Sequence, residues 1–169
     1  EIPEDASEEV ILEVRGLNRG KSIKDVSFNL KRGEILGFAG LMGAGRTEVA
    51  RAIFGADKID SGNILVHGQP VRINNPGDAV NNGIGYLSED RKRYGLTLGM
   101  NVENNMVLAS FKNFLGFAGW VKSPQIRETA RHYVDALSIK TPSVKQKAKN
   151  LSGGNQQKVV IGKWLTADT

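Results

Sequence analysis

A phosphate-binding pattern lies at residues 40–47, whose sequence is GLMGAGRT. The spacing matches G-x-x-x-x-G-K-[ST], with Arg46 where the pattern has lysine. Glycines in such a loop let several backbone N–H groups converge on phosphate oxygens, and the hydroxyl that follows the cation binds Mg²⁺. The loop is therefore a candidate phosphate site, and Thr47 is the candidate Mg²⁺ ligand.

Arg46 changes what this loop can do. Lysine carries a compact point charge, whereas arginine is a longer planar fork that cannot take up the same geometry. We therefore expect phosphate binding to survive the exchange and hydrolysis to slow. The alternative is that Arg46 is a tolerated cation and activity is normal.

A second candidate site is the sequence LSGGNQQK at residues 151–158, directly before a predicted helix. Ser152 can cap that helix, and its hydroxyl, the neighbouring N–H groups and the helix dipole would then point toward an anion. An ordinary N-cap is the alternative, and spacing alone does not separate the two. The predicted apolar stripe of the helix consists of Val160, Ile161, Trp164 and Leu165.

The predicted elements place the first loop between a strand and a helix. Alternating apolar and polar residues predict strands over 10–17 and 24–30, and the apolar run at 35–40 predicts a strand buried on both faces of an α/β sheet. The helix behind the loop has an apolar stripe of Val49, Ala50, Ile53 and Phe54 and ends at Gly55. The order is strand, glycine loop, helix.

The rest of the chain reads as a hairpin, one more strand and a set of helices. The hairpin joins residues 64–66 and 71–73 through a turn at 67–70, a short helix follows Pro76, and a strand spans 84–87. Helices are predicted over 101–109 and from Pro124 onward. The second helix has an apolar stripe of Ile126, Ala130, Tyr133, Val134 and Leu137. The aromatic stretch Phe111, Phe114, Phe117 and Trp120 is predicted to lie in the core of these helices, and contact with a partner subunit is the alternative.

Length and composition limit the class of protein. The 169 residues suit one ordinary domain, and 40% hydrophobic with 24% charged residues is typical of a soluble globular chain. Because there is no cysteine, thiolate metal sites, disulfides and thiol nucleophiles are excluded. The net charge is +5 although residues 1–9 carry five acids and no base, so the rest of the chain is basic. A basic body suits polyphosphate ligands, nucleic acid or anionic membranes, and the plainer alternative is a solvated charged face.

Together, the two motifs resemble those of ABC-type ATPases: GLMGAGRT resembles the phosphate loop in a degenerate form, and LSGGNQQK resembles the signature motif. Between them, residues 85–93 (GYLSEDRKR) are similar to the Q-loop variant in the second nucleotide-binding domain of tandem carbohydrate-uptake ATPases of the ribose, xylose and galactose type. The resemblance implies an α/β fold: a P-loop NTPase (RecA-like) core with an antiparallel β subdomain and a helical signature subdomain. It also implies that the core is incomplete at the C-terminus, because the Walker B strand would begin where the chain ends.

The resemblance also assigns the site residues. The implied nucleotide-contacting residues are Gly40, Gly43, Ala44, Gly45, Arg46, Thr47, Glu48, Glu89, Leu151, Ser152, Gly153, Gly154, Asn155 and Gln156, with Thr47 binding the metal. Glu89 stands where the family usually has the Q-loop glutamine. No catalytic base is assigned within the chain, so the isolated chain is expected to be inactive or nearly so.

The partners and cofactors follow from the same resemblance. ATP and Mg²⁺ are the implied cofactors, and a second ABC nucleotide-binding domain is expected to pair head to tail with this one. The intact signature would then serve the partner's ATP site. A transmembrane permease subunit and, indirectly, a substrate-binding protein are the further partners, which implies sugar import at the cytoplasmic face of the membrane; no nucleic acid is expected.

A non-transport regulatory or nucleic-acid-associated ATPase of the ABC type is the alternative, and the basic body would suit it. A GTPase lacks its Asn-Lys-x-Asp motif here, and a dinucleotide dehydrogenase lacks G-x-G-x-x-G.

The expected domain organisation has a lead-in or linker over residues 1–9 and a partial nucleotide-binding domain over 10–169. That domain divides into a β and phosphate-loop part (10–90), a mainly helical part (91–155) and the signature helix (156–169). The chain is expected to be a piece of a longer ATPase.

Overall fold

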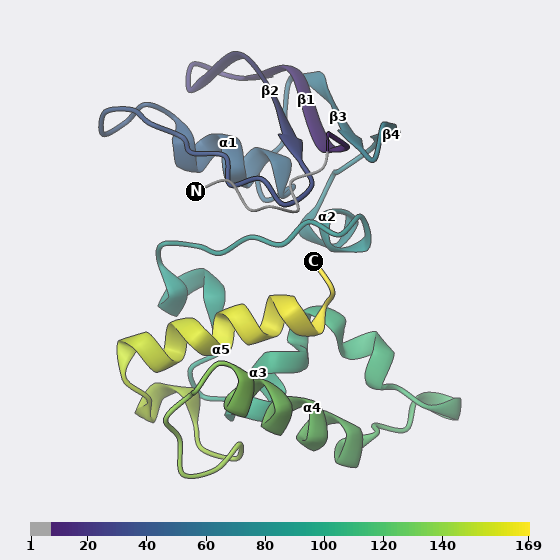
Figure 1. The fold of residues 1–169 in the computed structure, drawn as a ribbon, viewed down its shortest axis with the longest axis vertical. Coiled ribbons are helices and arrows are strands. Elements are labelled where there is room, and N and C mark those ends of the chain that lie inside the picture. Colours follow the sequence, from purple (N-terminus) through teal and green to yellow (C-terminus); the bar gives the residue numbers. More distant parts are fainter. Residues whose placement is uncertain (1–7) are drawn as a thin grey trace. The chain divides into compact units, whose positions relative to one another are not determined.

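A computed structural model of the chain describes residues 8–169, which form two compact units that divide between Ile84 and Gly85 (Figure 1). Most of the predicted lead-in over residues 1–9 lies outside the described residues. In the described part of the chain, no helix is long and apolar enough to span a membrane.

Unit one contains a four-stranded antiparallel sheet in the order β2-β1-β3-β4. The strands are β1 (Val10–Arg19), β2 (Ile23–Lys31), β3 (Ser61–Val66) and β4 (Gln69–Val71). The strands predicted over 10–17 and 24–30 are confirmed. The predicted hairpin is confirmed as well, but its turn is tighter than predicted. His67 and Gly68 alone form it, with φ of 48° and 73°, as expected of a two-residue type I′ turn. Pro70 therefore lies in β4, an edge strand, where its missing N–H is tolerated.

Helix α1 (Arg46–Ile53) packs on this sheet (Figure 1). Its predicted apolar stripe is confirmed except that Ala52 is buried in place of Ala50. The core of the unit combines Val49, Ala52 and Ile53 of the helix with Val14, Leu17, Ile23 and Ile64 of the strands. Gly55, with φ of 72°, follows the end of the helix as predicted. The second helix, α2 (Pro76–Asn81), begins after Asn75, whose side chain accepts a hydrogen bond from the N–H of Asp78.

Two predicted strands, over residues 35–40 and 84–87, are absent. Neither segment has regular secondary structure, and Ile35 is 90% exposed. The apolar run correctly indicates a segment suited to a buried strand, but a strand is stable only when neighbouring strands satisfy its backbone groups. Among the described strands, no pair is parallel and none pairs with either segment.

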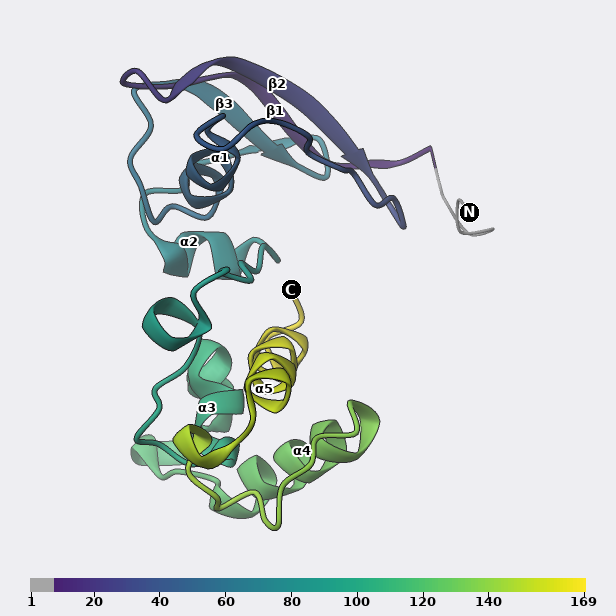
Figure 2. The same ribbon diagram turned by 90° about the vertical axis from the view of Figure 1, so that its left-hand side faces the viewer.

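Unit two is helical. Its elements are η1 (Arg91–Gly95), α3 (Val102–Val107), η2 (Leu108–Phe114), η3 (Phe117–Gly119), α4 (Ser123–Ala136), η4 (Ala148–Asn150) and α5 (Gly153–Thr166). Helices α3, α4 and α5 pack on one another around a core that includes Met106, Ala130 and Val160 (Figure 2). The predicted helix over 101–109 continues after Val107 as a 3₁₀ segment, and the stripe of α4 faces the core as predicted.

The buried faces of α5 and of the aromatic stretch differ from the predictions. Helix α5 buries Val159, Gly162 and Lys163 as well as the predicted Val160, whereas Leu165 is 44% exposed. Two of the buried side chains, Lys163 and Gln156, are polar and donate hydrogen bonds to backbone carbonyls. The buried face of α5 therefore could not be identified from apolar residues alone. Of the four aromatic residues in this stretch only Phe114 is buried; Phe117 and Trp120 are exposed, because they lie in a surface segment around η3.

Candidate functional site

The phosphate-loop candidate is an exposed loop that ends at the first residue of α1. Gly43 and Gly45 have φ of 83° and 84°, values that L side chains rarely adopt, and the N–H of Ala44 donates to the carbonyl of Leu41 at 3.0 Å. A Cβ on Gly40 would lie 2.9 Å from the Cβ of Ala44, so the loop closes tightly over its first glycine. Three of the predicted glycines thus have a geometric reason to be glycine.

Gly45 packs the loop against the turn between β1 and β2. A Cβ at this position would lie 2.6 Å from the carbonyl oxygen of Ser22, so only glycine allows the two backbones to approach. The carbonyl of Gly45 accepts the first helical hydrogen bond of α1, from the N–H of Val49 at 2.9 Å. The β1–β2 turn therefore sets where α1 begins.

Arg46, Thr47 and Glu48 form the first turn of α1. Arg46 and Thr47 are exposed, and neither makes a side-chain hydrogen bond to another residue in the range 8–169. A cation and a hydroxyl are thus available beside the helix N-terminus, which itself favours an anion. The other end of α1 is fixed by Arg51, which pairs with Asp57 at 2.8 Å and holds the pKa of that carboxyl below its usual range.

The remaining predicted residues lie in unit two. Glu89 is exposed, and the next residue, Asp90, accepts a hydrogen bond from the N–H of Arg93 at the start of η1. Ser152 occupies the N-cap position of α5, and Gly153, Gly154 and Asn155 form its first turn. Leu151 is buried in the core of the unit.

The side chain of Ser152 does not cap α5, in contrast to the expectation from sequence. Its Oγ accepts a hydrogen bond from Asn155 Nδ2 at 2.9 Å, and it makes no hydrogen bond to the N–H groups of the first turn. The position is that of an N-cap, but the hydroxyl oxygen is directed to the amide of Asn155 and away from the backbone N–H groups.

Gln156 holds the loop that precedes α5. It is 4% exposed, donates to the carbonyls of Ala148 and Leu151, and accepts from Arg91 Nε at 3.2 Å. All its described partners are inside unit two, so Gln156 stabilises the conformation of the loop before α5.

Arg91 is a residue of this site that the sequence does not reveal. Its Nη2 lies 2.6 Å from where a Cβ of Gly153 would be, so the glycine makes room for the guanidinium. Within the sequence, Arg91 belongs to a run of three bases that is typical of a solvated loop. Its contact with the start of α5 depends on folding, and the glycine at 153 is the only local signal of it.

Replacing Ser152 with alanine should cost little stability. A capping serine is usually worth about 1 kcal/mol, and we expect a loss below about 0.5 kcal/mol here because the cap bond is not made. Both tryptophans lie in unit two, so denaturation followed by tryptophan fluorescence measures the change.

The control for this measurement is Asn101→Ala. Asn101 caps α3 with a 2.9 Å hydrogen bond from the N–H of Asn104, so its loss should cost about 1 kcal/mol. Equal losses in the two variants would show that Ser152 caps α5 after all.

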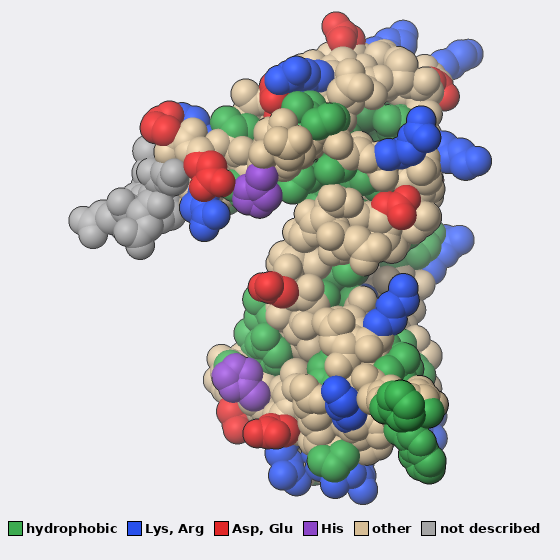
Figure 3. Space-filling view, turned by 90° about the vertical axis from the view of Figure 1, so that its right-hand side faces the viewer, with side chains coloured by type: hydrophobic (Ala, Val, Ile, Leu, Met, Phe, Trp, Pro, Cys, Tyr) green, Lys and Arg blue, Asp and Glu red, His purple; other side chains and the backbone are tan. Residues whose placement is uncertain are grey.

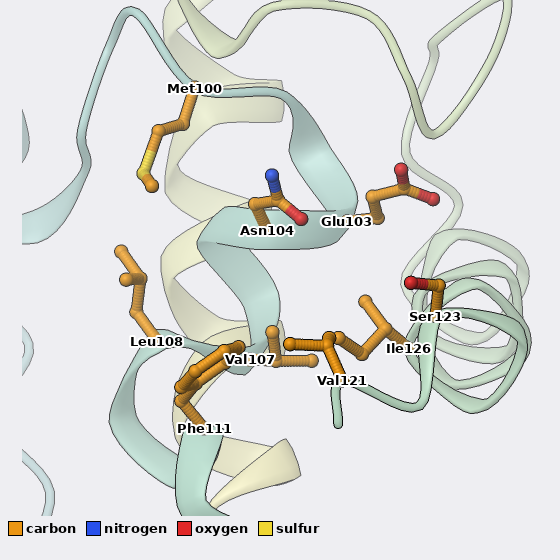
Figure 4. A pocket seen from close by; sticks show the side chains of 9 residues that line it. All are labelled: Met100, Glu103, Asn104, Val107, Leu108, Phe111, Val121, Ser123 and Ile126. Atoms are coloured by element: carbon orange, nitrogen blue, oxygen red, sulfur yellow. The ribbon is translucent and has the colours of Figure 1, made fainter. Parts of the chain in front are cut away.

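An apolar groove of about 370 Å³ lies between α3, η2 and the start of α4 (Figure 4). Val107, Leu108, Phe111 and Ile126 are among its lining residues. No lysine or arginine lines it, and its acid, Glu103, lies 3.6 Å from Arg127. The groove therefore lacks the cations of a phosphate site.

On the face drawn in Figure 3, basic side chains are dispersed among acidic ones and form no single basic patch.

Comparison with known proteins identifies the family. The family model described as ABC transporter matches residues 23–169. The chain is 60% identical, over 98% of its length, to the "Putative ribose/galactose/methyl galactoside import ATP-binding protein 3" of Burkholderia ambifaria. It is 55% identical, over 96% of its length, to the ribose import ATP-binding protein RbsA 3 of Rubrobacter xylanophilus. In both cases the chain spans 32% of the relative, or about a third of its length.

Solved structures agree on the fold. The ATP-binding cassette MJ0796 bound to ADP and Pi has a TM-score of 0.73 at 19% identity, covering 94% of this chain and 70% of that one. A cassette described as MJ1267 of an ABC transporter has a TM-score of 0.72 at 20% identity, covering 94% of this chain and 66% of that one. The predicted class, a P-loop NTPase cassette with an antiparallel sheet and a helical part, is thus confirmed. The chain belongs to the ABC transporter family.

Proposed function

We propose that this chain is the ATP-binding part of an ABC importer for a sugar of the ribose or galactose type. The observation that carries the proposal is the presence of two glycine-rich loops on one chain, each leading into a helix N-terminus: residues 40–47 before α1 and residues 151–154 before α5. The names of relatives at 55–60% identity, which include ribose and galactose import, support the substrate class.

The first loop would hold the phosphates of ATP. The backbone N–H groups around Gly43 and Gly45 and the N-terminus of α1 would surround the anion, and Arg46 would add charge. Thr47 suits Mg²⁺, because it offers a hard oxygen, and Mg²⁺ commonly takes one or two protein ligands with phosphates and water completing its shell. In the range 8–169, no three His, Asp or Glu side chains are grouped to hold a metal without phosphate.

The second loop would serve a second cassette. In a head-to-tail pair, Ser152, Gly153 and Gly154 would face the nucleotide on the partner's phosphate loop, while the partner's signature would face the nucleotide on this one. Because Arg46 replaces lysine, we expect this chain's own site to bind nucleotide and hydrolyse it slowly. The pair would act with a permease and a substrate-binding protein, as a peripheral component at the cytoplasmic face of the membrane.

A thermal melt with and without Mg-ATP tests the first loop. A ligand at 100 times its Kd stabilises the native state by about 2.7 kcal/mol, so the Tm should rise by several degrees. Arg46→Ala should lose most of the rise. Arg72→Ala removes an exposed arginine of the same unit away from the loop, and it should keep the rise. A Tm that is indifferent to Mg-ATP in the unmodified chain would refute nucleotide binding by this loop.

A further inference from the structure

The side chain of Asn155 joins two parts of unit two. Its Oδ1 accepts a hydrogen bond from the backbone N–H of Lys140 at 2.9 Å, and its Nδ2 donates to Ser152 Oγ at 2.9 Å. A backbone N–H can only donate, so the amide atom that faces Lys140 must be the oxygen. The amide nitrogen must then face Ser152, and the orientation of the side chain is determined by chemistry.

This orientation fixes what the Ser152 hydroxyl can do. A hydroxyl has one proton to donate and two lone pairs to accept with. Because Asn155 donates to Ser152 Oγ, the hydroxyl proton must point to another group. No described residue accepts it, and Ser152 is exposed, so the proton is available to a ligand in front of α5.

The same contact keeps the first turn of α5 open. A capping serine would turn its oxygen to the N–H groups of Gly154 or Asn155 and neutralise them. Here the oxygen is held by Asn155, so these N–H groups and the hydroxyl proton are all donors without a side-chain partner in the first turn. The guanidinium of Arg91, packed against Gly153, adds positive charge at the same end of the helix.

We infer that Asn155 is a positioning residue that keeps the Ser152 hydroxyl as a donor toward a phosphate group. The inference rests on the proposed function of the second loop, and the ligand is the terminal phosphate of a nucleotide held by a second cassette. Asn155 acts only through Ser152, so its amide orients the hydroxyl and does not contact the ligand. An aspartate of the same shape would reverse the bond, because a carboxylate accepts and Ser152 would have to donate to it.

A double-mutant cycle tests the inference. The measured quantity is the affinity of the chain for a second cassette, determined with and without Mg-ATP. Ser152→Ala and Asn155→Ala should each weaken ATP-dependent association about tenfold, since each removes the oriented donor. The double variant should be no weaker than Ser152→Ala alone, because Asn155 has no other route to the ligand. Additive losses would overturn the inference and make Asn155 a direct contact.

The isosteric change Asn155→Asp provides a second test. It should weaken association by at least tenfold while leaving the Tm of the chain unchanged or slightly raised, because an acid in the first helical turn favours the dipole. The matched control is Asn104→Asp, since Asn104 holds the same third position of α3 and is exposed. Association that survives Asn155→Asp would also overturn the inference.

Amide exchange on the chain alone separates this inference from the proposed function. The N–H of Lys140 should exchange at least tenfold faster in Asn155→Ala and at the unmodified rate in Asn155→Asp, which keeps an acceptor oxygen. Unchanged exchange in both variants would show that the Asn155 bridge does not form. Absence of ATP-dependent association in the unmodified chain, with the exchange result intact, would instead refute the role of the second loop in a cassette pair.

Discussion

Gly45→Ala should destabilise unit one by about 3 kcal/mol and remove the rise in Tm with Mg-ATP. The new methyl group would need a left-handed backbone, at φ of 84°, and would lie 2.6 Å from the carbonyl oxygen of Ser22. The obstacle is a backbone atom in the β1–β2 turn, which cannot rotate away as a long side chain can. The loop and the N-terminus of α1 must shift instead, and the donors of the proposed phosphate site shift with them.

Gly43→Ala is the control that separates strain from collision. Gly43 has nearly the same φ, 83°, but nothing lies within 4 Å of where its Cβ would be. We expect a loss of only about 1 kcal/mol for this variant. All tryptophans and tyrosines lie beyond Ile84, so far-UV circular dichroism or amide exchange of β1 and β2 is the suitable probe for unit one. Equal losses in the two variants would rule out the contact with Ser22.

Local patterns predicted the antiparallel elements well. The alternation in β1 and β2 and the glycine in the His67–Gly68 turn act over a few residues, and helix α1 follows from its stripe and its glycine stop. The segments at 35–40 and 84–87 were predicted from apolar character alone. Pairing with distant strands decides whether such a segment becomes a strand, and the sequence of the segment does not contain that information.

The sequence predicted the two loops of the candidate site, but not the side-chain contacts that hold those loops in place. Glycine spacing locates both loops, but the backbone demands glycine only in the first, where Gly43 and Gly45 have positive φ. In the second loop a Cβ on Gly154 would meet nothing within 4 Å. The contacts of Asn155 with Lys140 and of Arg91 with Gln156 join residues 15 and 65 positions apart, so no local pattern marks them. The sequence suggested Ser152 as a cap, and only the fold shows that an amide occupies its oxygen.

Lys163 should make the stability of unit two rise with pH above about 8. The side chain is 7% exposed, and burial lowers its pKa from 10.5 to about 8. Its Nζ donates to the carbonyl of Gly95 at 2.8 Å and lies 4.5 Å from the centre of the Trp164 ring, and no acid of the described residues pairs with it. The neutral form is therefore favoured in the folded chain relative to the unfolded chain.

The sign follows from proton binding. Between pH 8 and 10.5 the unfolded chain holds the lysine proton and the folded chain has released it, so raising the pH favours the folded state. The free energy of unfolding should gain about 3 kcal/mol across this window, and below pH 8 the full cost of burying the charge is present. Tryptophan fluorescence during denaturation at several pH values measures the gain.

Lys163→Met isolates the contribution of this one group. Methionine keeps the apolar stem, so the variant should lack the rise. At pH 7 it should match the unmodified chain within about 1 kcal/mol, because relief from charge burial offsets the loss of the donor to Gly95. Above pH 10.5 the variant should be less stable than the unmodified chain, since the lost hydrogen bond is then the only difference between them.

Lys158→Met is the control. Lys158 lies on the same helix and donates to the carbonyl of Ser138 at 3.1 Å, but it is only partly buried. If both variants lose the rise equally, burial of Lys163 is not its cause. If only Lys163→Met loses it, the bond between α5 and the end of η1 is made by a charged lysine at neutral pH, and this contact is kept at a cost in stability.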